Sequence, residues 1–129
     1  MADSQDEKPE RISEAEHAVM EVLWKRSPLT AADVCDQVGA ERDWSLATVK
    51  TLLSRLVTKQ AIQTAPDGRR FLYSPSIERA DYTGAESRRL VDRLFGGRAA
   101  TLFAQLAESE ALSEDDIAEM EALLKELRK

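Results

Sequence analysis

SLATVKTLLSRLVT (residues 45–58) is a strongly periodic segment, and the elements on either side can be placed from it. Ser45 suits an N-cap, because its hydroxyl can accept a hydrogen bond from a backbone N–H of the first turn. Apolar side chains recur at helical spacing and predict a buried stripe. This stripe consists of Val49, Leu52, Leu53, Leu56 and Val57. We therefore expect a helix with one side packed into a core.

The opposite face of this helix is small, hydroxylated and basic. It consists of Ala47, Thr48, Lys50, Thr51, Ser54, Arg55 and Thr58. No acid occurs between Ser45 and Lys59, whereas an ordinary solvated face mixes acids with bases. Close approach to a groove lined with phosphates would explain both the small side chains and the missing acids.

A β-hairpin is predicted after this helix. β-Branched and aromatic residues occupy 61–64 and 70–73, on either side of a Pro66-Asp67-Gly68 turn. Two adjacent arginines, Arg69 and Arg70, lie at its tip.

Two shorter helices are predicted before residue 45. The first is capped by Ser13 and ends at Ser27-Pro28, because the residue before a proline is disfavoured in a helix. The second opens with a capping box of Thr30 and Asp33 and is expected to reach about Val38, where Gly39 would stop it. Three helices and a hairpin predict a winged helix-turn-helix, in which the third helix enters the major groove of DNA.

The remaining sequence predicts short amphipathic helices. Gly96-Gly97 ends one of them, and Ser113 with Asp116 caps another, whose apolar residues follow the 3-4-3 spacing of a coiled-coil seam. About 50 residues in such helices bury their apolar stripes poorly alone, so we expect a homodimer. The candidate dimerisation residues are Leu90, Val91, Leu94, Phe95, Leu102, Phe103, Leu106, Ile117, Met120, Leu124 and Leu127.

The fold class is therefore mainly α, with a winged helix-turn-helix followed by a helical dimerisation region. We expect a disordered N-terminal tail over residues 1–11, a DNA-binding domain over 12–75 and a dimerisation domain over 76–129. The net charge of the 129 residues is -6, yet residues 44–73 contain five bases and one acid. A local basic patch of this kind can meet phosphate although the whole chain is anionic.

Composition and motifs exclude several other classes. No apolar run could span or insert into a membrane, and the first eleven residues do not read as a secretory signal. The chain has one cysteine, Cys35, so no internal disulfide can form, and a reducing cytoplasm is the compartment that fits best. Cys35 and the single histidine, His17, are too few to complete a metal site. We therefore expect neither a metal nor a cofactor. Structural roles are expected for both residues, with a redox switch at Cys35 as the alternative. Catalytic motifs are absent, so the chain is not expected to be an enzyme.

The chain contains a set of characteristic segments: ISEAE (12–16), Val19-Met20, Trp24, DWS (43–45), TVKTLLSRL (48–56), FLYS (71–74), LFGG (94–97) and the closing leucine-rich helix. Together they resemble the BlaI/MecI/CopY family of penicillinase-repressor-like regulators. The resemblance covers roughly residues 12–127. It implies a dimeric winged-helix repressor on palindromic promoter DNA.

The resemblance also implies roles for individual residues. Thr48 and Lys50 match positions that read base edges, and phosphate contacts are expected mainly from Ser45, Thr51, Arg55, Arg69 and Arg70. In β-lactam-responsive members, a membrane sensor protease of the BlaR/MecR type cuts the repressor at an Asn-Phe bond. The matching position here is Gln105-Leu106, which departs from that pair. Copper-responsive members carry a cysteine-rich C-terminal hook, and this chain has no cysteine after Cys35.

An alternative function is a winged helix used as a protein-interaction adaptor that does not bind DNA specifically. An adaptor has little reason to keep acids off the outward face of residues 45–58. Salt dependence separates the two readings, because DNA binding weakens steeply as salt rises.

Overall fold

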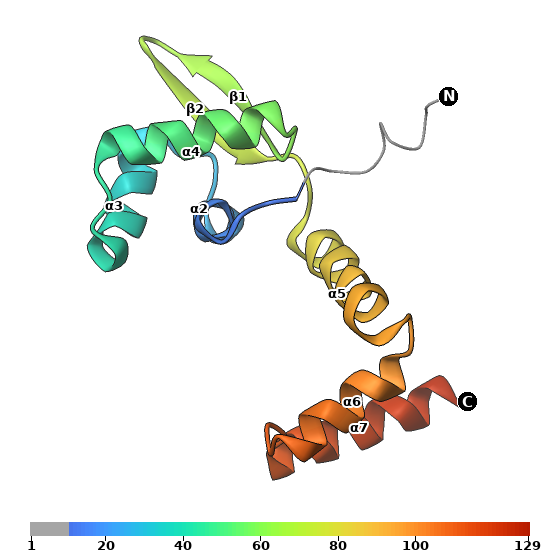
Figure 1. The fold of residues 1–129 in the computed structure, drawn as a ribbon. Coiled ribbons are helices and arrows are strands. Elements are labelled where there is room, and N and C mark those ends of the chain that lie inside the picture. Colours follow the sequence, from blue (N-terminus) through green and yellow to red (C-terminus); the bar gives the residue numbers. More distant parts are fainter. Residues whose placement is uncertain (1–10) are drawn as a thin grey trace. The chain divides into compact units, whose positions relative to one another are not determined.

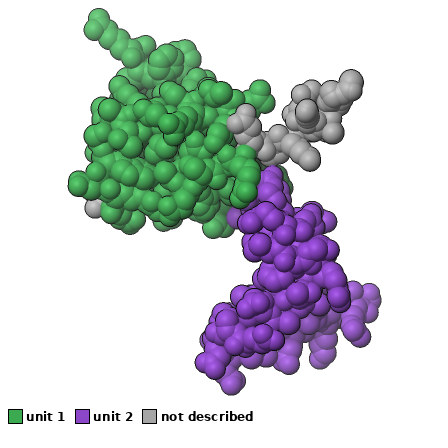
Figure 2. Space-filling view, in the orientation of Figure 1, with its two compact units in different colours: residues 1–82 green, residues 83–129 purple. Residues whose placement is uncertain are grey.

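The computed structural model describes residues 11–129, with Ala40 described only through its backbone. Except for Arg11, the predicted tail lies outside the described residues. The chain divides into two compact units, residues 1–82 and 83–129 (Figure 2). The elements are α2 (Glu14–Lys25), α3 (Ala31–Arg42), α4 (Leu46–Thr58), β1 (Ile62–Asp67), β2 (Arg70–Pro75), α5 (Arg79–Phe95), α6 (Ala99–Glu108) and α7 (Glu114–Leu127) (Figure 1). This mainly helical fold with a two-stranded hairpin confirms the predicted class.

The predicted helix starts are confirmed by their caps. Ser13 and Thr30 each accept a hydrogen bond from the backbone N–H three residues on, and Ser113 does the same at α7. In each case the acid at that third position returns a hydrogen bond to the cap backbone, which completes a capping box. Ser45 caps α4 in the same way, without an acid in the first turn.

The predicted end of the second helix was wrong. Helix α3 continues through Gly39 to Arg42 and ends at Asp43, which adopts a left-handed conformation with φ 56°. A Cβ atom at position 39 would lie 3.3 Å from the Trp44 carbonyl oxygen and 3.7 Å from Cys35 Sγ. Gly39 therefore permits a close approach of the chain rather than a helix stop.

Strands β1 and β2 form the predicted antiparallel hairpin, in which Asp67 faces Arg70 across the turn. Gly68 has a φ of 66°, which glycine adopts without the steric cost of a side chain. At the base of the hairpin, Leu29 and Tyr73 exchange two backbone hydrogen bonds of 3.1 and 2.8 Å. These bonds attach the wing to the segment between α2 and α3.

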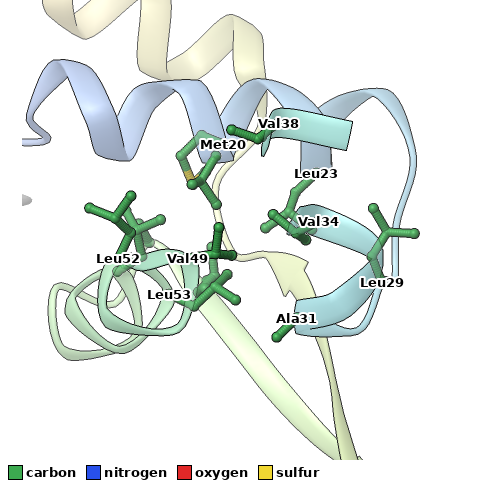
Figure 3. Packing of buried hydrophobic residues seen from close by; sticks show 13 residues of the cluster. Met20, Leu23, Leu29, Ala31, Val34, Val38, Val49, Leu52 and Leu53 are labelled. Carbon is green, nitrogen blue, oxygen red and sulfur yellow. The ribbon is translucent and has the colours of Figure 1, made fainter. Parts of the chain in front are cut away.

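The hydrophobic core lies where α2, α3 and α4 meet (Figure 3). Met20 and Leu23 come from α2, Val34 from α3, and Leu53 from α4, and all four are completely buried. The buried stripe predicted for residues 45–58 is confirmed at Val49, Leu52, Leu53 and Leu56. Val57 was predicted wrongly: it is 37% exposed, because it lies at the edge of that stripe.

The N-terminal unit includes the start of α5. The Trp24 indole N–H donates to the Ile77 carbonyl at 2.9 Å, and the Arg79 guanidinium makes two hydrogen bonds to the Glu21 carboxylate, at 3.0 and 3.2 Å. The His17 ring stacks on Tyr82 with 5.6 Å between centroids. These contacts tie residues 77–82 to α2.

The C-terminal unit has a different character. No residue of α5, α6 or α7 is buried. Leu94 is 55% exposed, Leu124 52% and Leu127 80%. Helix α7 begins with a capping box and α6 has no side-chain cap, and the apolar faces of the three helices stay largely exposed in the single chain.

Candidate nucleic-acid interface

The start of α4 is fixed by its own hydroxyl groups. Ser45 Oγ accepts a hydrogen bond from the Thr48 backbone N–H at 3.2 Å, and the two hydroxyl oxygens lie 3.1 Å apart. Behind them, the Arg42 guanidinium lies 5.3 Å from the centre of the Trp44 ring and 3.5 Å from a carboxylate oxygen of Glu14. The contact of Arg42 with α2 is a long, solvent-exposed ion pair, which contributes little to stability.

The outward face of α4 is exposed along its whole length. The exposed residues are Ala47, Thr48, Lys50, Thr51, Ser54, Arg55 and Thr58. The Thr51 hydroxyl donates to the Ala47 carbonyl oxygen at 3.1 Å. Among the described ion pairs, none involves Lys50 or Arg55. Both charges are available to an anionic partner.

The two arginines of the wing differ in their ion pairing. Arg70 Nη2 forms an ion pair with Asp67 Oδ2 at 2.8 Å, directly across the turn. Arg69 forms none of the ion pairs in the described part of the chain. From the sequence the two arginines were predicted to be equivalent, although the three-residue spacing of Asp67 and Arg70 could have indicated the pair.

Lys59, the remaining base of the 44–73 window, points inward. Its Nζ lies 2.6 Å from Glu16 Oε1 and 2.8 Å from the Arg11 carbonyl oxygen. Glu16 is only 1% exposed. Burial raises its pKa, but the hydrogen bonds from Lys59 and Ser13 outweigh burial and leave the pKa below its ordinary value. Lys59 therefore neutralises a buried carboxylate. The bases of residues 44–73 that form no ion pair with a described residue are Lys50, Arg55 and Arg69.

Neither tryptophan ring is exposed enough to stack on a nucleic-acid base. Trp24 and Trp44 are half-buried and pack against the core. His17 Nε2 lies 3.0 Å from Glu21, and Cys35 is half-buried with its Sγ 3.8 Å from the Trp44 carbonyl oxygen. Over residues 11–129, no three His, Cys, Asp or Glu side chains gather into a group that could hold a metal ion.

The candidate dimerisation residues lie on α5, α6 and α7. Leu90, Leu94, Phe103, Ile117, Leu124 and Leu127 are exposed, whereas Val91, Phe95, Leu102, Leu106 and Met120 are half-buried. The Gln105-Leu106 bond lies inside α6, so a protease would need to unwind that helix locally to reach it. None of the helices in the described part of the chain has the length and apolar character needed to cross a bilayer.

Three helices around one core, a hairpin wing attached at Leu29, and an exposed acid-free third helix define a winged-helix protein of the DNA-binding class. The sequence model described as "Penicillinase repressor" matches residues 12–126. The chain therefore belongs to the penicillinase repressor family, a family of transcriptional repressors rather than enzymes.

Individual relatives agree with this assignment. The penicillinase repressor of Bacillus licheniformis is 33% identical over 116 residues, which cover 90% of this chain and 91% of the relative. The methicillin resistance regulatory protein MecI of Mammaliicoccus sciuri is 31% identical over 119 residues, which cover 92% and 97%. The solution structure of monomeric Bacillus licheniformis BlaI in complex with the blaP half-operator is 39% identical, with a TM-score of 0.51. The match covers 58% of this chain and 92% of that one.

Proposed function

We propose that this protein is a dimeric repressor that binds palindromic promoter operators in a sequence-specific manner. Helix α4 enters the major groove, and the β1–β2 wing lies on the DNA backbone. The proposal rests on the outward face of α4, which is exposed and contains no acid, and whose Lys50 and Arg55 form none of the ion pairs found over residues 11–129. The family relationship supports the same function, because one relative's structure was determined with its half-operator.

Within this interface, Thr48 and Lys50 contact base edges. A lysine ammonium is a typical partner for the O6 and N7 acceptors of guanine. Ser45, Thr51, Arg55, Arg69 and Arg70 contact mainly phosphates, which sets the position of the protein without reading sequence. Arg69 is the stronger wing contact, because Arg70 already has Asp67 as a partner.

Dimerisation covers the exposed apolar faces of α5, α6 and α7. A two-fold dimer presents two α4 helices to the two halves of a palindrome. The repressor acts in the cytoplasm, where promoter DNA is accessible and the Cys35 thiol stays reduced.

The test is capture of genomic fragments by purified protein at ~150 mM salt, where non-specific binding is suppressed. Wild type, Lys50→Ala and Lys25→Ala are run in parallel. Lys25→Ala is the matched control, because it removes the same charge from the exposed end of α2. We expect wild type and Lys25→Ala to recover the same few promoter fragments with a shared palindrome.

Lys50→Ala should lose the preference for those fragments, by about 1–3 kcal/mol of discrimination, while remaining folded and dimeric. If wild type shows no enrichment, or binding is insensitive to salt, the adaptor function is favoured instead. If Lys50→Ala fails to fold or dimerise, Lys50 is a structural residue and its assignment to a base is wrong.

A further inference from the structure

Leu46 is a large apolar residue that the fold leaves exposed at the start of α4. It follows the Ser45 cap directly and is 41% exposed. The core side of α4 is formed by Val49, Leu52, Leu53 and Leu56, so Leu46 lies at the edge of that side. Its neighbour along the same flank is Lys50, one turn further on.

The composition of this first turn is unlike that of the other capped helices. Helices α2, α3 and α7 each have at least one acid in the first turn, where the helix dipole favours negative charge. Helix α4 has none, and it begins with Leu46 and Ala47. The missing acid suits a helix end that approaches an anionic partner. The exposed leucine suits a partner that also offers an apolar group.

The hydroxyl groups near Leu46 also make hydrogen bonds within α4 when no DNA is bound. Thr48 and Ser45 lie within hydrogen-bonding distance of each other, and Thr51 donates its hydroxyl hydrogen to the Ala47 carbonyl oxygen. Leu46 and Ala47 come four and three residues before Lys50, so on the helix surface their hydrocarbon borders the lysine. This surface is suited to a contact with a methyl group beside a hydrogen-bond acceptor.

On the major-groove edges of the bases, the apolar group is the C5-methyl of thymine. We propose that Leu46 contacts a thymine methyl group and is a specificity-determining residue of the operator complex. Residues four apart on a helix are separated by about 6 Å along its axis, and successive base pairs by about 3.4 Å. The thymine lies within about two base pairs of the guanine read by Lys50. This inference rests on the proposed function.

The test uses an operator obtained from the fragment capture. Each thymine of one half-site, and its symmetry mate in the other, is replaced in turn by deoxyuridine, which removes only the methyl group. Binding of each duplex is measured for wild type, Leu46→Ala and Val57→Ala. Val57→Ala is the matched control, because Val57 is the other large exposed hydrophobic residue of α4 and lies at the opposite end of the helix.

For wild type, one thymine position within two base pairs of the guanine should show a loss of about three- to fivefold in affinity per half-site, the effect of one buried methyl group. Leu46→Ala should bind the unmodified operator more weakly by a similar factor and should not respond to deoxyuridine at that position. Val57→Ala should respond as wild type does. Circular dichroism of the variants confirms that α4 is intact.

If Leu46→Ala responds to deoxyuridine as wild type does at every position, the inference is overturned while the repressor function stands. The same holds if no thymine near the guanine is sensitive in wild type. If wild type selects no sequence in the fragment capture, the proposed function fails, and the inference falls with it.

Discussion

The winged-helix unit and the C-terminal helices are both built from amphipathic helices, but only the winged helix covers its own apolar side chains. In the first, Met20, Leu23 and Leu53 are completely buried. In the second, no residue of α5, α6 or α7 is buried, and Leu127 is 80% exposed. Apolar burial is the main favourable contribution to folding. The first unit therefore buries its apolar side chains within its own fold, whereas the second would gain the same contribution only in the dimer that we propose.

The variant with the largest expected effect tests this difference between the winged helix and the C-terminal helices. Leu124→Asp places a charge on the apolar seam of α7 and should give a monomer by light scattering. Operator affinity should then fall by about 10²-fold or more, because the second half-site contact is no longer intramolecular. Thermal unfolding of the winged helix should stay unchanged.

The control for this variant is Ala122→Asp, which adds the same charge to the opposite side of α7, where it should leave the dimer intact. A stable Leu124→Asp dimer would place the dimer interface elsewhere. Loss of the winged-helix transition in Leu124→Asp would contradict the independence of the first unit.

An intermediate effect concerns the buried Glu16 and its half-buried partner Lys59, which belong to the winged-helix unit. The pKa of Glu16 is lowered in the folded protein, so its ionised form stabilises the fold above the ordinary glutamate pKa. That contribution is lost as the pH falls through the lower pKa of the folded state. Glu16→Gln should therefore cost about 1–3 kcal/mol near neutral pH, because Lys59 loses its partner.

The difference between Glu16→Gln and wild type should shrink as the pH falls below about 4. Denaturant unfolding at several pH values measures it. Glu14→Gln is the matched control in the same turn, because Glu14 is largely exposed and its contact with Arg42 is 3.5 Å. An equal cost for the two variants at neutral pH would show that burial of Glu16 does not matter.

Local features of the fold could be predicted from sequence, because they depend on neighbouring residues. The caps at Ser13, Thr30, Ser45 and Ser113 each need only a hydroxyl and a helix start. The end of α3 was missed, because the role of Gly39 depends on the approach of the Trp44 carbonyl oxygen. A glycine signals a close approach as readily as a helix end.

The charge state of the candidate site was only partly predictable. Lys59 belongs by sequence to the basic window, yet it pairs with Glu16, 43 residues earlier. Such a pair arises from the packing of α2 against α4, and no local pattern reveals it. Lys50 and Arg55 form no ion pair with a described residue, which agrees with the absence of acids between residues 45 and 59 and with the exposure of that face of α4.

The smallest expected effect distinguishes the two arginines of the wing. Arg69→Ala should weaken binding to all DNA sequences about two- to fivefold and reduce the salt slope of log K by about 1. Arg70→Ala should do less, because Asp67 already neutralises that guanidinium at 2.8 Å. Asp67→Asn is the converse variant: it frees Arg70 and should strengthen binding and steepen the salt slope. Fluorescence anisotropy over a salt series measures all three. Equal effects of Arg69→Ala and Arg70→Ala would mean that the Arg70–Asp67 ion pair breaks when DNA binds, so that both arginines contact phosphates.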